Sequence, residues 1–130
     1  CFDVNAGDCL TFDFEMKPFF IGANPKVAFD CGKYAVQKGP IVYCMESVDN
    51  GEGICDIHLD CNAEFSEGFD EAIGVPTLMV DAYRRRAMDG LYYKKADDSI
   101  DFYKTDATLI PYFAFANRGE AEMQVWHFVK

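Results

Sequence analysis

Three polar side chains that could bind a cation recur at every second position of one short stretch: Asp56, His58 and Asp60. In an extended chain they project from one face, with neighbours roughly 7 Å apart. Carboxylate and imidazole ligands must converge to roughly 2.0–2.6 Å from a metal ion, whereas the side chains of one straight strand diverge. We therefore expect a solvated strand face rather than a weak cation site.

Two pairs of carboxylates, Asp13 with Glu15 and Glu120 with Glu122, have the spacing of glycosidase acids, which lie roughly 5–9.5 Å apart. Any polar strand face meets this distance. A catalytic acid also needs a pocket that raises its pKa, and no pattern in the sequence indicates one. The sequence also lacks a nucleophile elbow, a phosphate-binding glycine loop and a zinc-protease motif. We predict no catalytic residue and no cofactor in this chain.

The six cysteines include no pair two or three residues apart, which is the spacing that a zinc knuckle needs. Cys44 lies in an apolar run, where a free thiol behaves as a small hydrophobic side chain. We predict reduced structural cysteines and no metal site. Reduced cysteines favour cytosol-like surroundings, so the expected localisation is cytoplasmic.

The length of 130 residues, half of them hydrophobic, can bury one substantial core, so we expect a single domain over residues 1–130. The net charge of -10 would repel phosphate backbones and anionic lipid. No stretch approaches the roughly 20 apolar residues that span a bilayer, and the first residues lack the basic start of a secretion signal. We expect neither nucleic acid nor a membrane as a partner.

The elements that position these side chains are predicted to be β-strands. Apolar residues alternate with polar ones over residues 10–16 and 54–61, and each range is expected to form one strand. Two apolar runs, 34–36 and 41–45, flank Lys38-Gly39-Pro40, which predicts a kinked strand or one that changes sheets. In total, seven to nine short strands predict an all-β, antiparallel, jelly-roll-like β-sandwich.

The end of the chain predicts a closing hairpin of strands 109–116 and 121–128. Asn117 tolerates a left-handed turn, Gly119 needs no side-chain room, and Arg118 is expected to donate to nearby carbonyls or to Glu120 and Glu122. Pro111 fits an edge position or a bulge in its strand, which leaves Tyr112 to point at a neighbouring surface.

Exposed aromatic side chains would give sugar rings a surface on which to stack. The candidates are Tyr92, Tyr93, Tyr103 and Trp126. An all-β domain of this size also fills its core with aromatics, so most of them are expected to pack inside. The basic triplet Arg84-Arg85-Arg86 is expected to pair with Asp81 or Asp89, or to meet a partner domain.

Several short motifs occur in the order found near the carboxyl end of glycoside hydrolase family 127, the β-L-arabinofuranosidase family, which this sequence resembles. They are Gly7-Asp8, Gly39-Pro40, Tyr43-Cys44, Glu46, Asp49-Asn50, Ile110-Pro111-Tyr112, Asn117-Arg118-Gly119 and Met123-Gln124-Val125-Trp126. The resemblance implies a carboxyl-terminal β-sandwich. Residues 1–17 could be the closing strand of a preceding sandwich domain rather than part of this one, because domain boundaries tend to lie near junctions such as Pro18.

The resemblance assigns catalysis to a helical (α/α)6 barrel, where a zinc-bound cysteine is the nucleophile and glutamates lie nearby. That barrel is absent here, so zinc is expected only outside this chain and Cys44 is not the catalytic cysteine. The implied role is to support the catalytic barrel, with a homo-oligomer contact as a second expected partner. The residues expected to serve structure or docking are Gly39, Pro40, Tyr43, Cys44, Glu46, Pro111, Tyr112, Asn117, Arg118, Gly119 and Trp126.

Two alternatives stay open for the isolated chain. One is an independent carbohydrate-binding module, for which glycan binding would be the evidence. The other is a small hydrolase, which would turn over an arabinofuranoside by itself. Fold-level analogy cannot assign the substrate.

Overall fold

The computed structural model describes residues 5–86, 91–92 and 101–130. Its regular structure is almost all β, as the alternating pattern predicts. Three short helical turns are present: α1 (Ser47–Asn50), η1 (Ile54–Asp56) and η2 (Tyr112–Ala114). The strands are β1 (Pro18–Gly22), β2 (Tyr34–Lys38), β3 (Ile41–Glu46), β4 (Ile57–Leu59), β5 (Ser66–Asp70), β6 (Val75–Arg85), β7 (Phe102–Pro111), β8 (Met123–Gln124) and β9 (Phe128–Val129).

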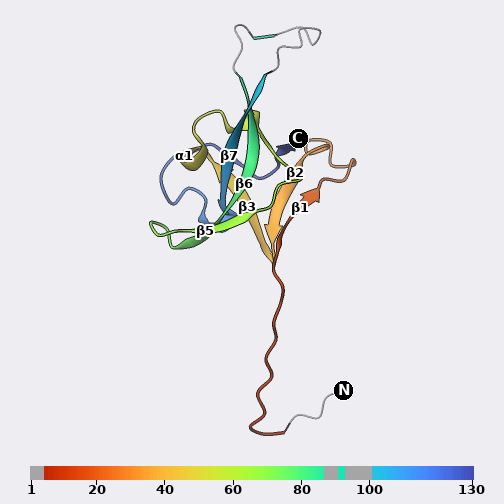
Figure 1. Ribbon diagram of the computed structural model, residues 1–130, viewed down its shortest axis with the longest axis vertical. Helices are drawn as coiled ribbons and strands as arrows, with labels where there is room; N and C mark the ends of the chain where they lie inside the picture. Colours follow the sequence, from red (N-terminus) through yellow and green to blue (C-terminus); the bar gives the residue numbers. More distant parts are fainter. Residues whose placement is uncertain (1–4, 87–90, 93–100) are drawn as a thin grey trace.

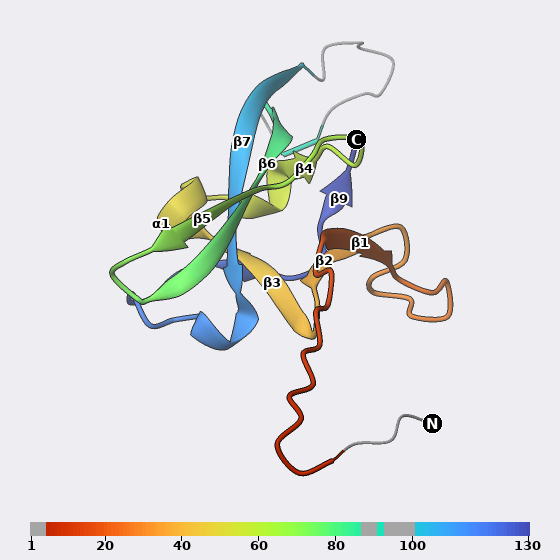
Figure 2. The ribbon, with the colours of Figure 1, turned by 60° about the horizontal axis from the view of Figure 1, so that its bottom comes forward.

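The strands form one curled sheet in the order β1-β2-β3-β7-β6-β4-β9, with β5 beside β6 and β8 beside β3 (Figures 1 and 2). The sheet is mixed, because β9 runs parallel to β4. His127, just before β9, exchanges two backbone hydrogen bonds of 2.8 and 2.9 Å with Tyr34 of β2. The curl therefore brings the two ends of the sheet together.

The all-β class is confirmed, but the two-layered sandwich is not. All named strands in the described part of the chain belong to one sheet, rather than to two packed layers. Among the same residues, no helix is long and apolar enough to cross a bilayer.

The core lies inside the curl, where side chains from β2, β3, β4, β6 and β7 meet. Burial alternates along β6: Leu78, Val80 and Ala82 point inward, whereas Met79 is exposed. This is the period expected of a strand with one packed face. A second, smaller apolar cluster contains Cys44, Val75, Ile110 and Ala114. The main cluster contains Val36, Tyr43, Met45, Ile54, Ile57, Leu59, Leu78, Val80, Ala82, Ala107 and Leu109.

The kinked strand predicted around Gly39 is wrong, because the chain turns back there. β2 and β3 form an antiparallel hairpin in which Lys38 lies opposite Ile41, with Gly39 and Pro40 between them. Gly39 has φ +56°, a conformation that glycine adopts without strain. Glycine at the first position of a two-residue loop is typical of hairpin turns.

The strand predicted over residues 54–61 is shorter than expected. Residues 54–56 form η1, and only Ile57–Leu59 is a strand. Gly53, with φ +70°, starts this turn, and the Glu122 carboxylate accepts hydrogen bonds from the N–H groups of Gly53 and Ile54. A partner 68 residues further along the chain therefore decides the local conformation.

The closing hairpin is also wrong, because β3 lies where the second strand was expected. Ile110 of β7 pairs with Cys44, and Met123 of β8 pairs with Glu46, so both segments flank β3. Between them the chain makes η2 and a turn in which Ala116, rather than Asn117, has a positive φ of 63°.

The strand predicted over residues 10–16 is not formed within this chain. Residues 8–17 have no regular structure, and Figure 1 shows them running away from the body. The alternating pattern is present, but a strand also needs a neighbour for its backbone N–H and C=O groups. None of the described strands pairs with this segment.

Candidate functional site

Three carboxylates from two segments of the chain meet around one guanidinium group, that of Arg118. Glu46 ends β3, Asp49 lies in the following α1 turn, and Asp70 ends β5. Arg118 itself comes from the turn after η2, so its charge lies where the ends of two strands and one helical turn approach each other.

The contacts of Arg118 use both terminal nitrogens. Nη1 and Nη2 donate to the two carboxylate oxygens of Asp49 at 2.7 and 2.5 Å. Nη2 also donates to Oε2 of Glu46 at 2.6 Å, and Nη1 to Oδ2 of Asp70 at 2.9 Å. This fork-to-fork pairing is the strong form of a carboxylate–guanidinium contact. We call Arg118, Glu46, Asp49 and Asp70 the Arg118 clamp.

Burial makes the clamp more than a surface ion pair. The side chain of Glu46 is 1% exposed and that of Arg118 is 13% exposed. Hydrogen bonds from Arg118 to Asp49 and Glu46 raise its pKa above the usual range, against the opposing effect of burial. Because the second oxygen of Glu46 accepts the N–H of Ala116 at 2.9 Å, both oxygens of this buried carboxylate have donors. A buried charge requires hydrogen-bond partners of this kind.

A second set of side-chain contacts extends the clamp into the sheet. The Asn50 amide donates to the carbonyl of Thr108 and accepts from its N–H, at 2.9 and 2.8 Å, as a backbone neighbour would. On the other side, Ser47 Oγ accepts the N–H of Glu122. Arg84 donates to the carbonyls of Asn50 and Gly53. The sequence alone does not indicate these roles, although the motif Asp49-Asn50 lies at this place.

Of the predicted site residues, the structure brings Glu46 and Asn117-Arg118-Gly119 together. Arg118 does not donate to Glu120 or Glu122 as expected, because Glu122 is bound to Gly53 and Ile54. Asn117 donates to the carbonyl of Ala114 within the same turn. Gly119 has φ +114°, which agrees with its predicted turn role.

The other motif residues serve packing. Tyr43 and Cys44 are buried in β3, and Pro111 is buried at the end of β7. Gly39 and Pro40 form the β2–β3 turn. Trp126 is half-buried between β8 and β9, and its carbonyl accepts the Gln124 amide.

Among the described cysteines, Cys44 is buried, whereas Cys9, Cys31, Cys55 and Cys61 are exposed, and these five thiols are free. Burial, with the nearby Glu46 carboxylate as a second cause, raises the pKa of the Cys44 thiol to about 12. A thiol with such a pKa is protonated at neutral pH and is a poor nucleophile.

The candidate cation ligands are occupied by protein partners. Asp56 pairs with Arg84 at 3.0 Å. The ring of His58 packs against those of Phe102 and Phe128, and burial followed by the charge of Arg85 lowers its pKa. Asp60 accepts the Tyr83 hydroxyl at 3.3 Å. Within the described ranges, no group of three His, Cys, Asp or Glu side chains is arranged to hold a metal ion.

The basic triplet is used mainly within the domain. Arg84 binds Asp56 and loop carbonyls, and Arg86 pairs with Asp101 at 3.4 Å. The guanidinium of Arg85 lies over the ring of Phe102. The expected pairing with Asp81 is not seen, because Asp81 binds Lys104 at 2.6 Å.

The sugar-stacking candidates within the described residues differ in exposure. Tyr92 is 93% exposed and Tyr103 43% exposed, Trp126 is half-buried, and Tyr93 lies outside the described residues. A groove of about 630 Å³ occurs elsewhere, between β1 and the chain before β5. Its lining includes Phe19, Phe20, Phe65, Glu64 and Glu67.

Two adjacent aromatic side chains, Tyr112 and Phe113, are exposed in the η2 turn, which precedes Arg118 in the chain. They are 50% and 67% exposed, whereas Ala114 of the same η2 turn is 2% exposed. Ala114 packs in the smaller apolar cluster, and Phe115 packs against it. The turn is therefore anchored on one side and presents two aromatic rings to the outside.

Comparison with known proteins gives consistent matches over the folded body. Residues 18–127 match the family model described as the glycoside hydrolase family 127 C-terminal domain. A curated relative, the non-reducing end β-L-arabinofuranosidase of Bifidobacterium longum subsp. longum, is 36% identical over 135 residues, which cover 95% of this chain and 20% of the relative. The chain thus spans about a fifth of the length of this relative.

Solved structures agree in shape as well as in sequence. A family 127 β-L-arabinofuranosidase from Geobacillus stearothermophilus T6 superimposes with a TM-score of 0.81 and 37% identity, over 90% of this chain and 19% of that protein. A second family 127 β-arabinofuranosidase gives a TM-score of 0.70 and 36% identity, over 90% and 18% of the two chains.

Proposed function

Because this chain belongs to the family of glycoside hydrolase family 127 C-terminal domains, we propose that it is the non-catalytic, supporting domain of a β-L-arabinofuranosidase-like hydrolase. In this role it stabilises the catalytic barrel of the longer protein, here called the parent. The domain provides no step of the reaction. Its contribution is to hold a docking surface in a fixed position.

The observation that carries this proposal is the use made of the motif residues. Glu46, Arg118 and Asp49 form an internal clamp, and the exposed pair Tyr112 and Phe113 lies in the η2 turn that precedes Arg118 in the chain. Exposed aromatic side chains on a rigid turn are typical of the centre of an interface. The clamp thus acts as the base on which a docking surface is held.

The charges of the clamp argue against a hydrolytic role. A glycosidase acid carries a proton because an apolar pocket raises its pKa. Glu46, Asp49 and Asp70 instead all bind the guanidinium of Arg118, so their oxygens are engaged by a protein partner rather than facing an apolar pocket. The buried Cys44 is likewise no candidate for the zinc-bound nucleophile of the family, and we assign no zinc ligand to the described residues.

A hydrolysis assay tests this role. The isolated chain, given a chromogenic β-L-arabinofuranoside, is expected to release no more product than buffer. The parent should hydrolyse the same substrate. Turnover by the isolated chain that Glu46→Gln or Cys44→Ala abolishes would refute the proposal and favour the small hydrolase.

The groove between β1 and the chain before β5 favours a second candidate, the independent carbohydrate-binding module. Its volume of about 630 Å³ is that of a small-molecule site, and it combines phenylalanine rings with two carboxylates. Calorimetric titration of the isolated chain with arabinose oligosaccharides tests this. Binding that Phe19→Ala removes and Tyr92→Ala leaves unchanged would favour the module.

A further inference from the structure

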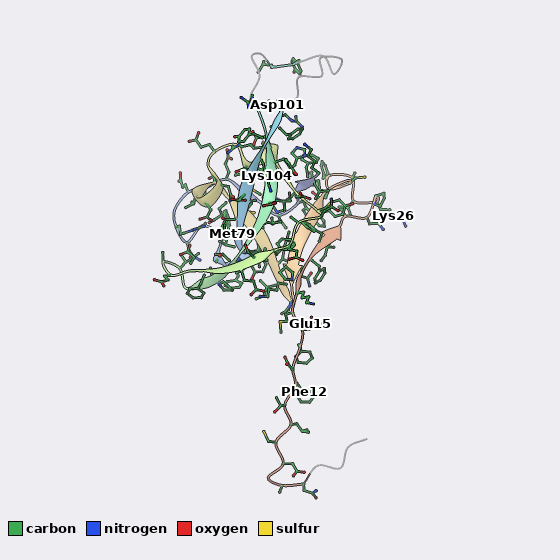
Figure 3. All side chains as sticks on the ribbon, viewed as in Figure 1. Phe12, Glu15, Lys26, Met79, Asp101 and Lys104 are labelled. Carbon is green, nitrogen blue, oxygen red and sulfur yellow. The ribbon has the colours of Figure 1, made fainter. Side chains whose placement is uncertain are left out.

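The chain before β1 carries an apolar stripe that the domain does not use. Leu10, Phe12, Phe14 and Met16 alternate with Thr11, Asp13 and Glu15, and the four apolar side chains are 48–74% exposed. Figure 3 shows Phe12 and Glu15 on a segment that extends away from the body. The rings of Phe12 and Phe14 lie 6.4 Å apart and almost parallel, so they share one face.

Such a stripe is costly when it is left in water. Burying a phenylalanine side chain stabilises a fold by about 1.5–3 kcal/mol. Two exposed rings and a leucine therefore lack a stabilisation of several times the thermal energy. An extended segment also presents a row of backbone N–H and C=O groups that lack partners. When the segment joins a sheet, its apolar side chains are buried and its backbone groups gain hydrogen-bond partners.

The root of the segment is fixed to this domain. The side chain of Met16 packs so closely on the β2–β3 turn that a Cβ atom at Gly39 would lie 2.6 Å from its Sδ. Lys17 pairs with Glu15 at 2.5 Å. The stripe beyond Met16 thus starts at the surface of the domain and points outward, away from its core.

The comparisons indicate which part of the parent lies at this end. The family model begins at residue 18, whereas the similarity to the curated relative covers 95% of the chain and so reaches well before residue 18. The matched family is a C-terminal domain, and the chain spans 20% of the relative. The remainder of a protein of that kind lies on the amino-terminal side, next to the stripe.

We propose that residues 10–16 form a β-strand that completes the sheet of the folded unit immediately upstream in the parent. Leu10, Phe12 and Phe14 fill the apolar interior of that unit, and Thr11, Asp13 and Glu15 face water. The strand then belongs to one unit and the body from Pro18 onward to the next, so the two are joined without a free linker.

This inference rests on the proposed function only in that the chain is one part of a longer protein. Amide hydrogen exchange of residues 10–16 tests it, measured in the isolated chain and in the parent. In the isolated chain these amides should exchange at the rate of an open chain. In the parent they should exchange at least about 100-fold more slowly, as expected for a strand inside a folded unit.

Matched variants of the parent separate the two faces of the strand. Phe12→Ser combined with Phe14→Ser should abolish the protection, because it removes the buried side chains. Thr11→Ser combined with Asp13→Asn changes only the wet face and should preserve it. Both pairs lie outside the clamp, so the body from residue 18 onward should keep its own protection in each variant.

Two results would overturn the inference. Equally fast exchange of residues 10–16 in the parent and in the isolated chain would show that no sheet receives them. Protection that appears in the isolated chain and rises with its concentration would show that a second copy is the partner. Hydrolysis by the isolated chain would refute the proposed function without altering these exchange rates, so the two failures are distinguishable.

Discussion

Arg118 and Asp49, 69 residues apart in the sequence, face each other fork to fork, with both terminal nitrogens of the arginine bound to both carboxylate oxygens of the aspartate. The same guanidinium reaches the buried carboxylate of Glu46. The contact fixes the α1 turn and the turn after η2 relative to β3. It is a charged, two-pronged link between segments that neither local propensity nor apolar packing would align.

Replacing Arg118 by alanine should destabilise the domain by about 3 kcal/mol, because it leaves the buried Glu46 carboxylate unpaired. For a domain of this size, a loss of that order corresponds to a fall in Tm of roughly 10 °C. Arg118→Lys keeps the charge without the fork, and it should recover only part of this loss. Calorimetry of the isolated chain measures both effects.

The control for this variant is Arg86→Ala. Arg86 is 66% exposed, and its pair with Asp101 is 3.4 Å long. Exposed pairs of this kind contribute at most about 1 kcal/mol, so the Tm should change little. Equal shifts for the two alanine variants would show that the clamp is not a stabilising unit.

The sequence predicts the all-β class and the two strands on either side of Gly39, but not the clamp. Strands β2 and β3 follow from the apolar runs 34–36 and 41–45, because side chains of both strands pack in the core. The partners of Arg118 do not follow, since Glu46, Asp49 and Asp70 are 48–72 residues away and only the assembled sheet brings them together. The predicted closing hairpin failed for the same reason: β3, from earlier in the chain, takes the place beside β8.

Lowering the pH should destabilise the domain through His127. This ring is fully buried, and burial lowers its pKa from 6.5 to about 4. In the unfolded chain His127 binds a proton below pH 6.5, whereas in the folded protein it stays neutral down to about pH 4. Stability should therefore fall between pH 6.5 and 4, by up to about 3 kcal/mol.

Urea unfolding at pH 7.0 and pH 4.5 measures this loss of stability. Comparing the loss in the wild-type protein with that in two histidine variants identifies the residue responsible. His127→Phe should reduce the pH dependence. His58→Gln should leave most of it in place, because His58 is only partly buried. A pH dependence that is identical in the wild-type and His127→Phe proteins would contradict the assignment.

Cys44 should resist alkylation in the folded domain. Burial raises its pKa to about 12, so almost no thiolate forms at pH 8. Iodoacetamide at pH 8 should therefore modify the exposed residues Cys9, Cys31, Cys55 and Cys61 first, as mass spectrometry of the digested protein would show. In 6 M guanidinium all five should react. Labelling of native Cys44 at the rate of Cys55 would indicate an accessible, activated thiol and reopen a catalytic role.

Tyr112 and Phe113 should matter in the parent but not in the isolated chain. Both side chains are at least half exposed, so Tyr112→Ser with Phe113→Ser should change the stability of the isolated domain by no more than about 0.5 kcal/mol. If the pair docks on the catalytic barrel, the same change removes buried contact area in the parent. Thermal unfolding of the parent should then occur at a lower temperature, with the domain melting as a separate step. Tyr92→Ser, which removes an aromatic ring that is 93% exposed, is the control and should alter neither protein. If the parent unfolds identically with and without the Tyr112 and Phe113 side chains, these residues are not the docking surface. Docking would then have to involve another face of the domain.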